Sequence, residues 1–322
     1  MLSRIAESLF WIGRYLERAE DTARILDVQL NQLLEGALSE EDTVARRLLS
    51  VMGVPAAPDT SVSLAALTAS LSISRDEPSS IYSSLRGARE NARSIRESIS
   101  SELWECLNAT MIALGQMVRA EPEMGPHEFF RFARTVRERV SIADGIADAT
   151  MSRDDGWQMM LLGRNIERAD MTARLLTAQI NDSVREPDWA TTLRACSAYE
   201  AYLRTYRGAL SAVNVVEFLM LDRYFPRSIY FALATAEECL AVLDQQQSRT
   251  GAGEEAKRIM GRARARLEYE TLSDIIQHLP LQLREVQTAC RDASSAIATT
   301  YFQRDATLAW RSDDAVSPRG GS

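Results

Sequence analysis

The stretch FWIGRYLERAEDTARILDVQLN, residues 10–31, has an apolar residue at every third or fourth position. This spacing keeps the apolar side chains on one face of an α-helix, which is typical of a helix that packs into a bundle. Ala19 and Ala23 narrow that face at its middle, so another helix can approach closely there. The apolar stripe consists of Leu9, Ile12, Leu16, Ala19, Ala23, Leu26, Leu30 and Leu33.

A second stretch, MLLGRNIERADMTARLLTAQIN at residues 160–181, repeats the first at a constant offset of 150. The two share 11 identical residues in 22 ungapped positions. A weaker match follows at an offset of 148, between RDEPSSIYSSL (75–85) and RYFPRSIYFAL (223–233). Two matches in the same order and at nearly the same offset predict a tandem duplication.

The duplication predicts two related helical repeats, residues 1–150 and 151–306, packed as one globular unit, with a disordered tail over 307–322. No segment alternates with period two over the length of a strand. We therefore predict an all-α fold, a helical bundle built from two tandem, internally duplicated halves with long helices. Pro78 and Pro226 suit first-turn positions of their helices. Helices are predicted at 3–35, 40–52, 61–72, 78–119 with a break near Ser101, 127–150, 155–184, 188–209, 211–221, 226–246, 254–277 and 281–304.

The 322-residue chain has a formal net charge of −8, which argues against broad binding to nucleic acid or to an anionic membrane. Lys257 is the only lysine, and its surroundings, GEEAKRIMGRA, do not form a phosphate-binding loop. No apolar run reaches the roughly 18 residues of a membrane span, and the charged amino terminus does not read as a signal peptide. We therefore expect a cytoplasmic protein. Buried thiols of a reducing compartment are expected at Cys106, Cys196, Cys239 and Cys290.

The polar residues that the two stretches share lie beside the apolar stripe, and two interpretations of them are open. In the structural interpretation, Glu17-Arg18 and Glu167-Arg168 pair across helices and fix how the two halves dock. In the functional interpretation, arginines line a pocket between the duplicated helices and hold a carboxylate or a phosphate through paired hydrogen bonds. The candidate binding or docking motif comprises Arg14, Glu17, Arg18, Arg24, Arg164, Glu167, Arg168 and Arg174.

Other sites are weaker. Acid–base catalysis by Glu17 and Glu167 is disfavoured, because the adjacent arginines would lower the pKa of both carboxyl groups. His127 and His278 lie next to proline-marked helix ends and lack the Glu-x-x-His pairs of a di-iron bundle, so no metal site is predicted. No dinucleotide fingerprint or nucleophile elbow occurs, and we predict no cofactor and no catalytic residue. Four further residues are expected either at core or interface positions or in the wall of a pocket: Trp11, Tyr15, Trp104 and Asn108.

Three segments, GRYLERAEDTAR, DDGWQMMLLGRNIERADMTARLL and EFLMLDRYFPRSI, resemble the Alpha-E family, an α-helical domain with a conserved Glu-Arg motif. The resemblance covers essentially all of residues 1–306 and assigns the motif to Glu17-Arg18 and Glu167-Arg168. One departure is that residues 71–77, LSISRDE, are more polar than their counterpart LMLDRYF. The departure concerns the equivalence of two loops and leaves the expected fold unchanged.

The resemblance also implies a context. Alpha-E proteins are typically encoded beside circularly permuted ATP-grasp proteins and transglutaminase-like peptidases, and a part in peptide-bond formation or peptide modification is proposed for them. We therefore expect a non-catalytic helical partner, or a ligand-binding component, of an ATP-grasp amidoligase system. Its motif helices would dock the partner or hold an acidic peptide-like ligand. The alternative is an enzyme that uses an Arg-lined pocket for acyl or phosphoryl transfer, and a homo-oligomer is compatible with either.

Overall fold

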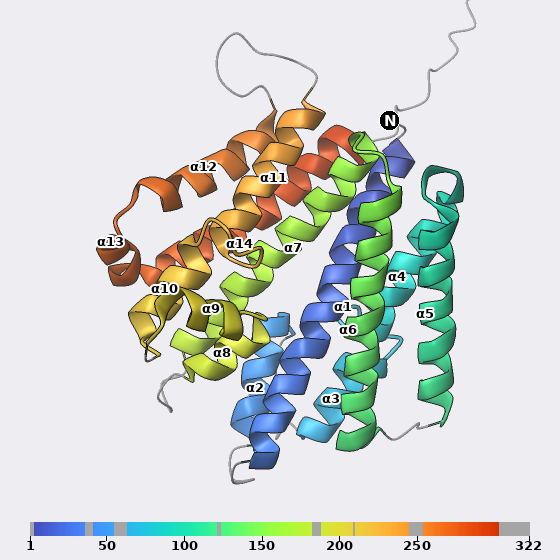
Figure 1. The fold of residues 1–322 in the computed structure, drawn as a ribbon, viewed down its shortest axis with the longest axis horizontal. Coiled ribbons are helices and arrows are strands. Elements are labelled where there is room, and N and C mark those ends of the chain that lie inside the picture. Colours follow the sequence, from blue (N-terminus) through green and yellow to red (C-terminus); the bar gives the residue numbers. More distant parts are fainter. Residues whose placement is uncertain are drawn as a thin grey trace, which may run out of the picture.

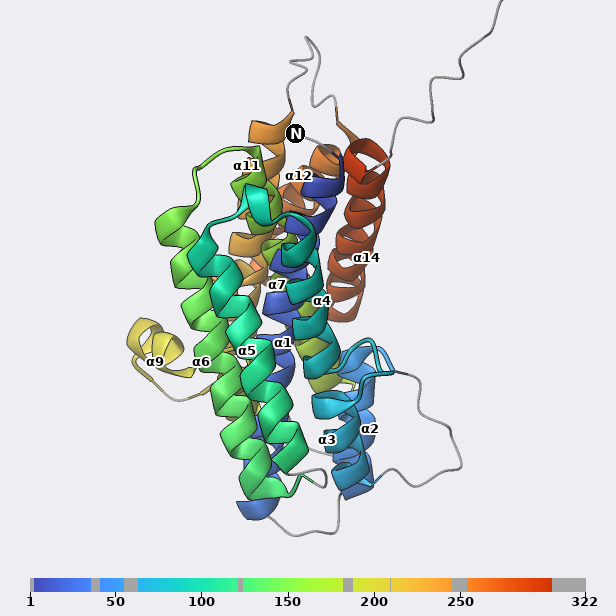
Figure 2. The ribbon, with the colours of Figure 1, turned by 90° about the vertical axis from the view of Figure 1, so that its right-hand side faces the viewer.

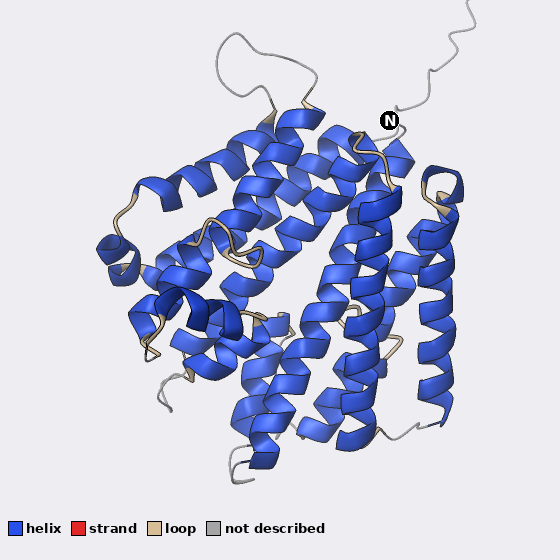
Figure 3. Ribbon diagram, viewed as in Figure 1, coloured by secondary structure: helices blue, strands red, loops and turns tan. Residues whose placement is uncertain are grey.

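The computed structural model describes residues 3–35, 41–54, 63–120, 124–181, 188–208, 210–244 and 254–302. Within these ranges the chain is helical between its turns and contains no strand, which confirms the predicted all-α fold (Figure 3). The helices are α1 (Ser3–Glu35), α2 (Glu41–Met52), α3 (Leu64–Ile73), α4 (Ile81–Ser94), the 3₁₀ turn η2 (Arg96–Ser98), α5 (Ser101–Ala120), α6 (Pro126–Thr150), α7 (Asp155–Ile180), α8 (Trp189–Ala195), α9 (Tyr199–Tyr206), α10 (Ala212–Leu221), α11 (Ile229–Leu243), α12 (Glu255–Tyr269), α13 (Leu272–Gln277), α14 (Leu279–Ile297) and the π-helical turn η3 (Ala298–Phe302).

Helices α1 and α7, which carry the two copies of the repeated stretch, lie side by side at the centre of the molecule (Figures 1 and 2). In the first half, α1, α4, α5 and α6 contact one another in a closed ring. In the second half, α7, α11, α12 and α14 do the same in the corresponding order. Each half is thus a four-helix arrangement, joined to the other through α1 and α7. The tandem duplication itself stays a prediction from the sequence.

The apolar stripe faces the core as the periodicity predicts. Ile12, Ala19 and Ala23 on α1 are fully buried, and so are Ala169 and Ala173 on α7. Because both helices are also covered by the outer helices of their own half, each buries most of its circumference. The burial of α1 against α7 therefore makes one continuous hydrophobic core from the two halves.

A close backbone contact between α1 and α7 lies at two glycines. A Cβ atom added at Gly13 would lie 2.1 Å from the carbonyl oxygen of Met160, and one added at Gly163 would lie 2.1 Å from that of Phe10. The two helices therefore touch backbone to backbone, and the contact is reciprocal. The close approach was predicted at Ala19 and Ala23. Ala19 is buried, but it lies more than one helical turn after the contact at Gly13.

Two predicted helix starts are wrong by about one turn. The positions that cap α4 and α11 are Ser80 and Ser228, whose hydroxyl groups accept hydrogen bonds from the backbone N–H groups of Ser83 and Phe231. Pro78 and the matching Pro226 thus precede their helices instead of occupying the first turn. The serine hydroxyl accepts a hydrogen bond from an N–H group of the first helical turn, which a proline side chain cannot do. This capping bond fixes the start of each helix.

Two predicted helices are each divided into two. The helix predicted at 188–209 is broken where Ser197 adopts a left-handed conformation with φ 54°, between α8 and α9. The helix predicted at 254–277 is divided into α12, which ends at Tyr269, and α13, which begins at Leu272. Thr271 caps α13, because its hydroxyl group accepts a hydrogen bond from the N–H group of Asp274. The break predicted near Ser101 is confirmed, because η2 separates α4 from α5. The predicted tail, 307–322, lies outside the described residues.

Candidate functional site

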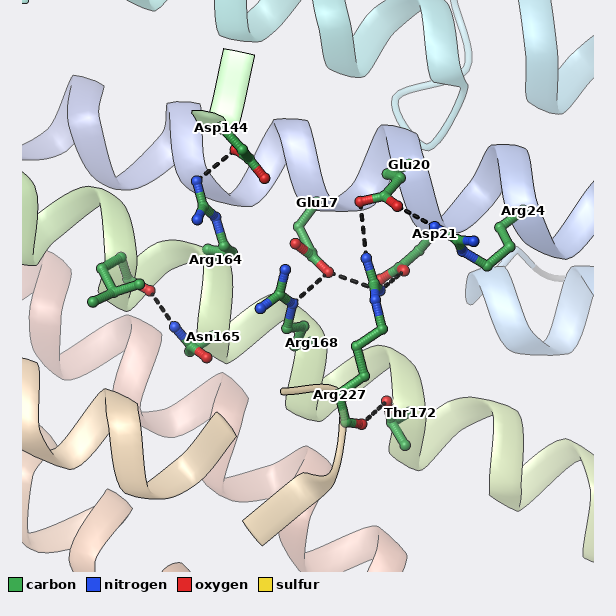
Figure 4. A network of polar contacts seen from close by, with 11 residues as sticks. Glu17, Glu20, Asp21, Arg24, Asp144, Arg164, Asn165, Arg168, Thr172 and Arg227 are labelled. Atoms are coloured by element: carbon green, nitrogen blue, oxygen red, sulfur yellow. Dashed lines mark hydrogen bonds and ion pairs between the residues drawn. The ribbon is translucent and has the colours of Figure 1, made fainter. Parts of the chain in front are cut away.

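The two Glu-Arg motifs meet between α1 and α7 and exchange ion pairs. Arg18 Nε donates to Glu167 Oε1 over 2.6 Å, and Arg168 Nε donates to Glu17 Oε1 over 2.7 Å (the second pair is drawn in Figure 4). This is the pairing across helices that the structural interpretation predicts. Gly13 lies against Met160, whereas Arg18, further along α1, pairs with Glu167, further along α7, so the two helices run parallel here.

Glu167 is held by two arginines from α1. Arg14 Nε donates to its Oε2 over 2.6 Å, beside the bond from Arg18, and the same guanidinium group donates to Ser294 Oγ of α14 over 3.0 Å. Burial opposes ionisation of Glu167, but the Arg14 and Arg18 guanidinium groups outweigh it and lower its pKa to about 2. Glu167 is therefore a buried carboxylate with more positive than negative charge around it.

Glu17 lies in the opposite environment, among other carboxylates. Arg227, from the loop before α11, contacts Glu17 over 2.8 Å and Glu20 over 2.8 Å, and also pairs with Asp21 (Figure 4). Burial opposes ionisation of Glu17, yet Arg168 and Arg227 lower its pKa. Burial raises the pKa of Asp21 to about 7, helped by Glu17 and Glu20 against the opposing effect of Arg227.

Arg227 was not among the predicted site residues, although it is buried and ties three acidic side chains together. The sequence indicates this residue only through a difference between the two halves: at the offset of 148, Ser79 is the counterpart of Arg227. Asp144 of α6 was also missed. It pairs with Arg164, and burial raises its pKa to about 6 although Arg164 opposes the rise.

The two remaining motif arginines pair within their own helices. Arg24 binds Glu20 one turn earlier, and Arg174 Nε donates to Asp170 Oδ2 over 2.8 Å. Arg174 also lies against Gly53, whose φ of 69° ends α2. The structure thus connects all eight predicted motif residues to carboxylate or guanidinium partners inside the molecule.

The predicted aromatic wall divides between two places. Trp11 and Tyr15 stack on each other with ring centroids 5.4 Å apart, and Arg14 and Arg18 lie over these rings at 5.6 Å and 6.0 Å. They therefore cover the arginines of the Glu167 side.

Trp104 and Asn108, by contrast, surround arginines of α4 and η2. The guanidinium group of Arg96 lies 4.9 Å from the Trp104 ring, and Arg89 Nε donates to Asn108 Oδ1 over 2.9 Å. Their described contacts are thus with Arg89 and Arg96 and not with the Glu-Arg motif.

The chemistry available to the described residues is limited. No group of His, Cys, Asp and Glu side chains in the described ranges is arranged to hold a metal ion. Burial raises the pKa of the Cys196 and Cys239 thiols to about 12, so neither is an activated nucleophile near neutral pH. His127 and His278 lie at helix ends, as predicted. In the part of the chain that the structure describes, no helix is both long and apolar enough to cross a membrane.

These features define an all-α domain in which two Glu-Arg motifs form a buried ion-pair network between parallel central helices. The family model of Alpha-E, described as a predicted alpha-helical domain with a conserved ER motif, matches residues 1–302. The chain therefore belongs to the Alpha-E family.

The chain is also similar to two uncharacterized mycobacterial proteins, Mb2597 of Mycobacterium bovis and Rv2567 of Mycobacterium tuberculosis. Each is 28% identical over 256 residues, which is 71% of this chain and 28% of the relative. The chain thus spans little more than a quarter of the length of these curated relatives. No solved structure matches it.

Proposed function

We propose that this protein is a non-catalytic helical component of an ATP-grasp amidoligase or peptide-modification system. It binds a protein partner or a ligand, while other proteins perform the chemistry. The observation that carries the proposal is the internal pairing of the motif, in which Arg18 and Arg168 are each engaged by a buried glutamate. An enzyme that turned Arg18 or Arg168 toward a substrate would take one of two arginines away from a buried glutamate, at a cost of roughly 1–3 kcal/mol. The pairing therefore disfavours acyl or phosphoryl transfer at this motif.

The size of the relatives also supports a partner role. In the mycobacterial relatives the matching segment is 28% of the chain, so it works beside a much longer stretch of other sequence. A helical segment that occurs within a larger polypeptide is suited to act in contact with other folded parts. The partners we propose are a circularly permuted ATP-grasp protein and a transglutaminase-like peptidase. We propose the cytoplasm as the compartment, in keeping with four free cysteines.

The proposal is tested by mixing the purified chain with the ATP-grasp protein encoded beside it. We expect a complex in size-exclusion chromatography with light scattering, which also reports any homo-oligomer. We expect ATP turnover by the ATP-grasp protein to change when the chain is added, and no turnover by the chain alone. Absence of a complex together with unchanged turnover would contradict the partner role. Transfer or hydrolysis by the chain alone would establish the enzyme alternative.

A motif variant separates folding from docking. Arg168→Met removes an arginine that binds the buried Glu17, and its matched control is Arg131→Met, an exposed position on α6. We expect the melting temperature of Arg168→Met to fall while each folded molecule still binds the ATP-grasp protein. A variant that keeps its circular dichroism and melting temperature but loses the partner would make the motif the docking surface.

A further inference from the structure

A groove of about 500 Å³ lies beside the carboxyl-terminal half of α1 and is lined also by α6, α8 and the start of α9. Its volume is within the range of small-molecule sites in proteins. Arg24, at the end of the Glu20–Arg227 network, forms part of its lining and so connects the groove to the buried ion pairs. The charged residues of the lining are Arg24, Arg137, Arg194, Asp27, Asp188 and Glu200.

Two of the three carboxylates in the groove are already used by the protein. Asp188 caps α8 by accepting from the N–H group of Thr191 over 3.0 Å, and it also accepts from the side-chain amide of Gln32 over 2.6 Å. Asp27 is bound by Arg137 over 3.0 Å. These contacts hold the walls together and leave Glu200 as the carboxylate with no hydrogen-bond or ion-pair partner among the described residues.

The positive side of the groove keeps unused hydrogen-bond donors. Arg24 and Arg137 each have a buried Nε–H group without an acceptor. Arg194 is exposed, its guanidinium group lies 4.8 Å from the centre of the Tyr199 ring, and no carboxylate of the described residues pairs with it. The first turn of α9 carries Glu200, a negative group that its N–H groups favour. The groove therefore offers the guanidinium group of Arg194 to an anion beside the free carboxylate of Glu200.

The balance of charge selects the kind of ligand. A phosphate dianion would meet three carboxylates as well as three arginines, and a simple amine would meet the three arginines. A molecule that carries both a carboxylate and an ammonium group would meet complementary charge at each end. Free amino acids and short peptides have this arrangement of charges.

We propose that the groove binds a zwitterionic ligand, a free amino acid or a short peptide with free ends. Its carboxylate is held by the exposed guanidinium group of Arg194, and its ammonium group by Glu200. The inference rests on the ligand-binding part of the proposed function and names the class of ligand. It assigns the ligand to the groove, whereas the internally paired Arg18 and Arg168 keep a structural role.

The test uses the purified chain alone. Ligand-observed NMR with the twenty amino acids and a random dipeptide mixture identifies binders, and titration calorimetry measures the best of them. The same ligand is then compared with its N-acetylated form, its carboxamide and inorganic phosphate. The variants are Arg194→Gln and Glu200→Gln, with Arg204→Gln as the matched control, because Arg204 is an exposed arginine of α9 outside the groove. Circular dichroism verifies that all three are folded.

We expect saturable binding with Kd below about 1 mM, weakened about tenfold or more by Arg194→Gln and unchanged by Arg204→Gln. Glu200→Gln should abolish the preference for the free amine over the acetylated form. No saturable binding by wild type, or equal binding by Arg194→Gln and Arg204→Gln, would overturn the proposal. Phosphate binding tighter than any zwitterion would also overturn it, in favour of a plain anion site. Because no ATP-grasp protein is present, failure here leaves the test of the partner complex unaffected.

Discussion

The same motif has two different electrostatic environments in this molecule. Glu167 is bound by Arg14 and Arg18, so two positive groups hold one negative group. Glu17 has Arg168 in the corresponding place, but it also shares Arg227 with two further carboxylates. The motif residues themselves are identical, and the difference comes from their neighbours.

Two residues on the Glu17 side, Asp21 and Arg227, contribute to the difference, beside Asp144, which binds Arg164. At the offset of 150, Met171 corresponds to Asp21, and at the offset of 148, Ser79 corresponds to Arg227. The first half thus adds a buried acid to its motif, and the second half adds the arginine that binds it. A buried charge is tolerated only with its counter-charge, so Asp21 and Arg227 are best regarded as one unit inserted into an otherwise reciprocal interface.

The largest loss of stability is expected at the glycine contact, which is the same on the α1 side and on the α7 side. Gly13→Leu and Gly163→Leu should each destabilise the protein by more than about 4 kcal/mol, because a Cβ atom would lie against a backbone carbonyl that cannot move aside. Urea denaturation, or the yield of folded protein, measures this. Gly145→Ala is the control, since a Cβ atom there meets no atom within 4 Å. A mild effect at one glycine and a severe effect at the other would show that the contact is not reciprocal.

The next effect distinguishes the two sides. Arg227→Met leaves Glu17, Glu20 and Asp21 buried without their shared partner and should cost about 3–5 kcal/mol. Arg18→Met leaves Arg14 on Glu167 and should cost roughly 1–3 kcal/mol. The free energies of unfolding of the two variants in urea give the comparison. Equal losses would mean that the surplus of acid around Glu17 does not matter.

A double substitution tests whether Asp21 and Arg227 form a unit. Asp21→Met with Arg227→Ser gives the first motif the neighbours of the second, and it removes a charge of each sign. We expect the double variant to be more stable than the sum of the two single losses predicts, by about 1 kcal/mol or more. A double-mutant cycle in urea measures this coupling, and purely additive losses would refute the pairing.

A further difference between the two sides is a dependence on pH. Asp21 has a pKa of about 7 when folded, raised from 3.8, so the folded state binds the extra proton between these values. The stability it contributes is present below about pH 4 and is lost as the pH rises to 7, by at most about 1.4 kcal/mol per pH unit. Glu167 has the opposite sign: its pKa is lowered from 4.5 to about 2, so its contribution is present above 4.5 and is lost as the pH falls through 2.

Asp21→Asn should therefore flatten the decline of stability between about pH 5 and pH 7. Urea midpoints across that range measure it, with the exposed Asp76→Asn as the control. An unchanged slope in Asp21→Asn would assign the pH dependence to another group. Asp144, whose pKa is raised to about 6, is the first such group to substitute.

Much of this arrangement was predictable because it depends on local periodicity. The stripe that includes Ile12 and Ala19 identifies the buried face of α1, and the repeated Glu17-Arg18 identifies the residues that pair. Gly13 and Gly163 were also visible as shared residues, but a glycine in a helix reveals a close approach only when the neighbouring helix is known.

The charge partners from outside the repeat were not predictable in the same way. Asp144 and Arg227 reach the motif from α6 and from the loop before α11, and neither stands at a spacing that links it to residue 17 or residue 164. Electrostatic pairing across a bundle has no sequence period, whereas burial of a helix face has one. The helix divisions at Ser197 and Thr271 were missed for a related reason, since capping residues act over one turn and leave the apolar pattern intact.

The exchange of arginines between the motifs has a consequence for dividing the chain. If residues 1–150 and 151–322 were produced as separate fragments, each would carry a glutamate whose arginines lie on the other fragment. Each would also expose the flat backbone surface around its glycine to water. The fragments would then be unstructured when alone and would recover the fold on mixing, as complementary parts of a split protein do.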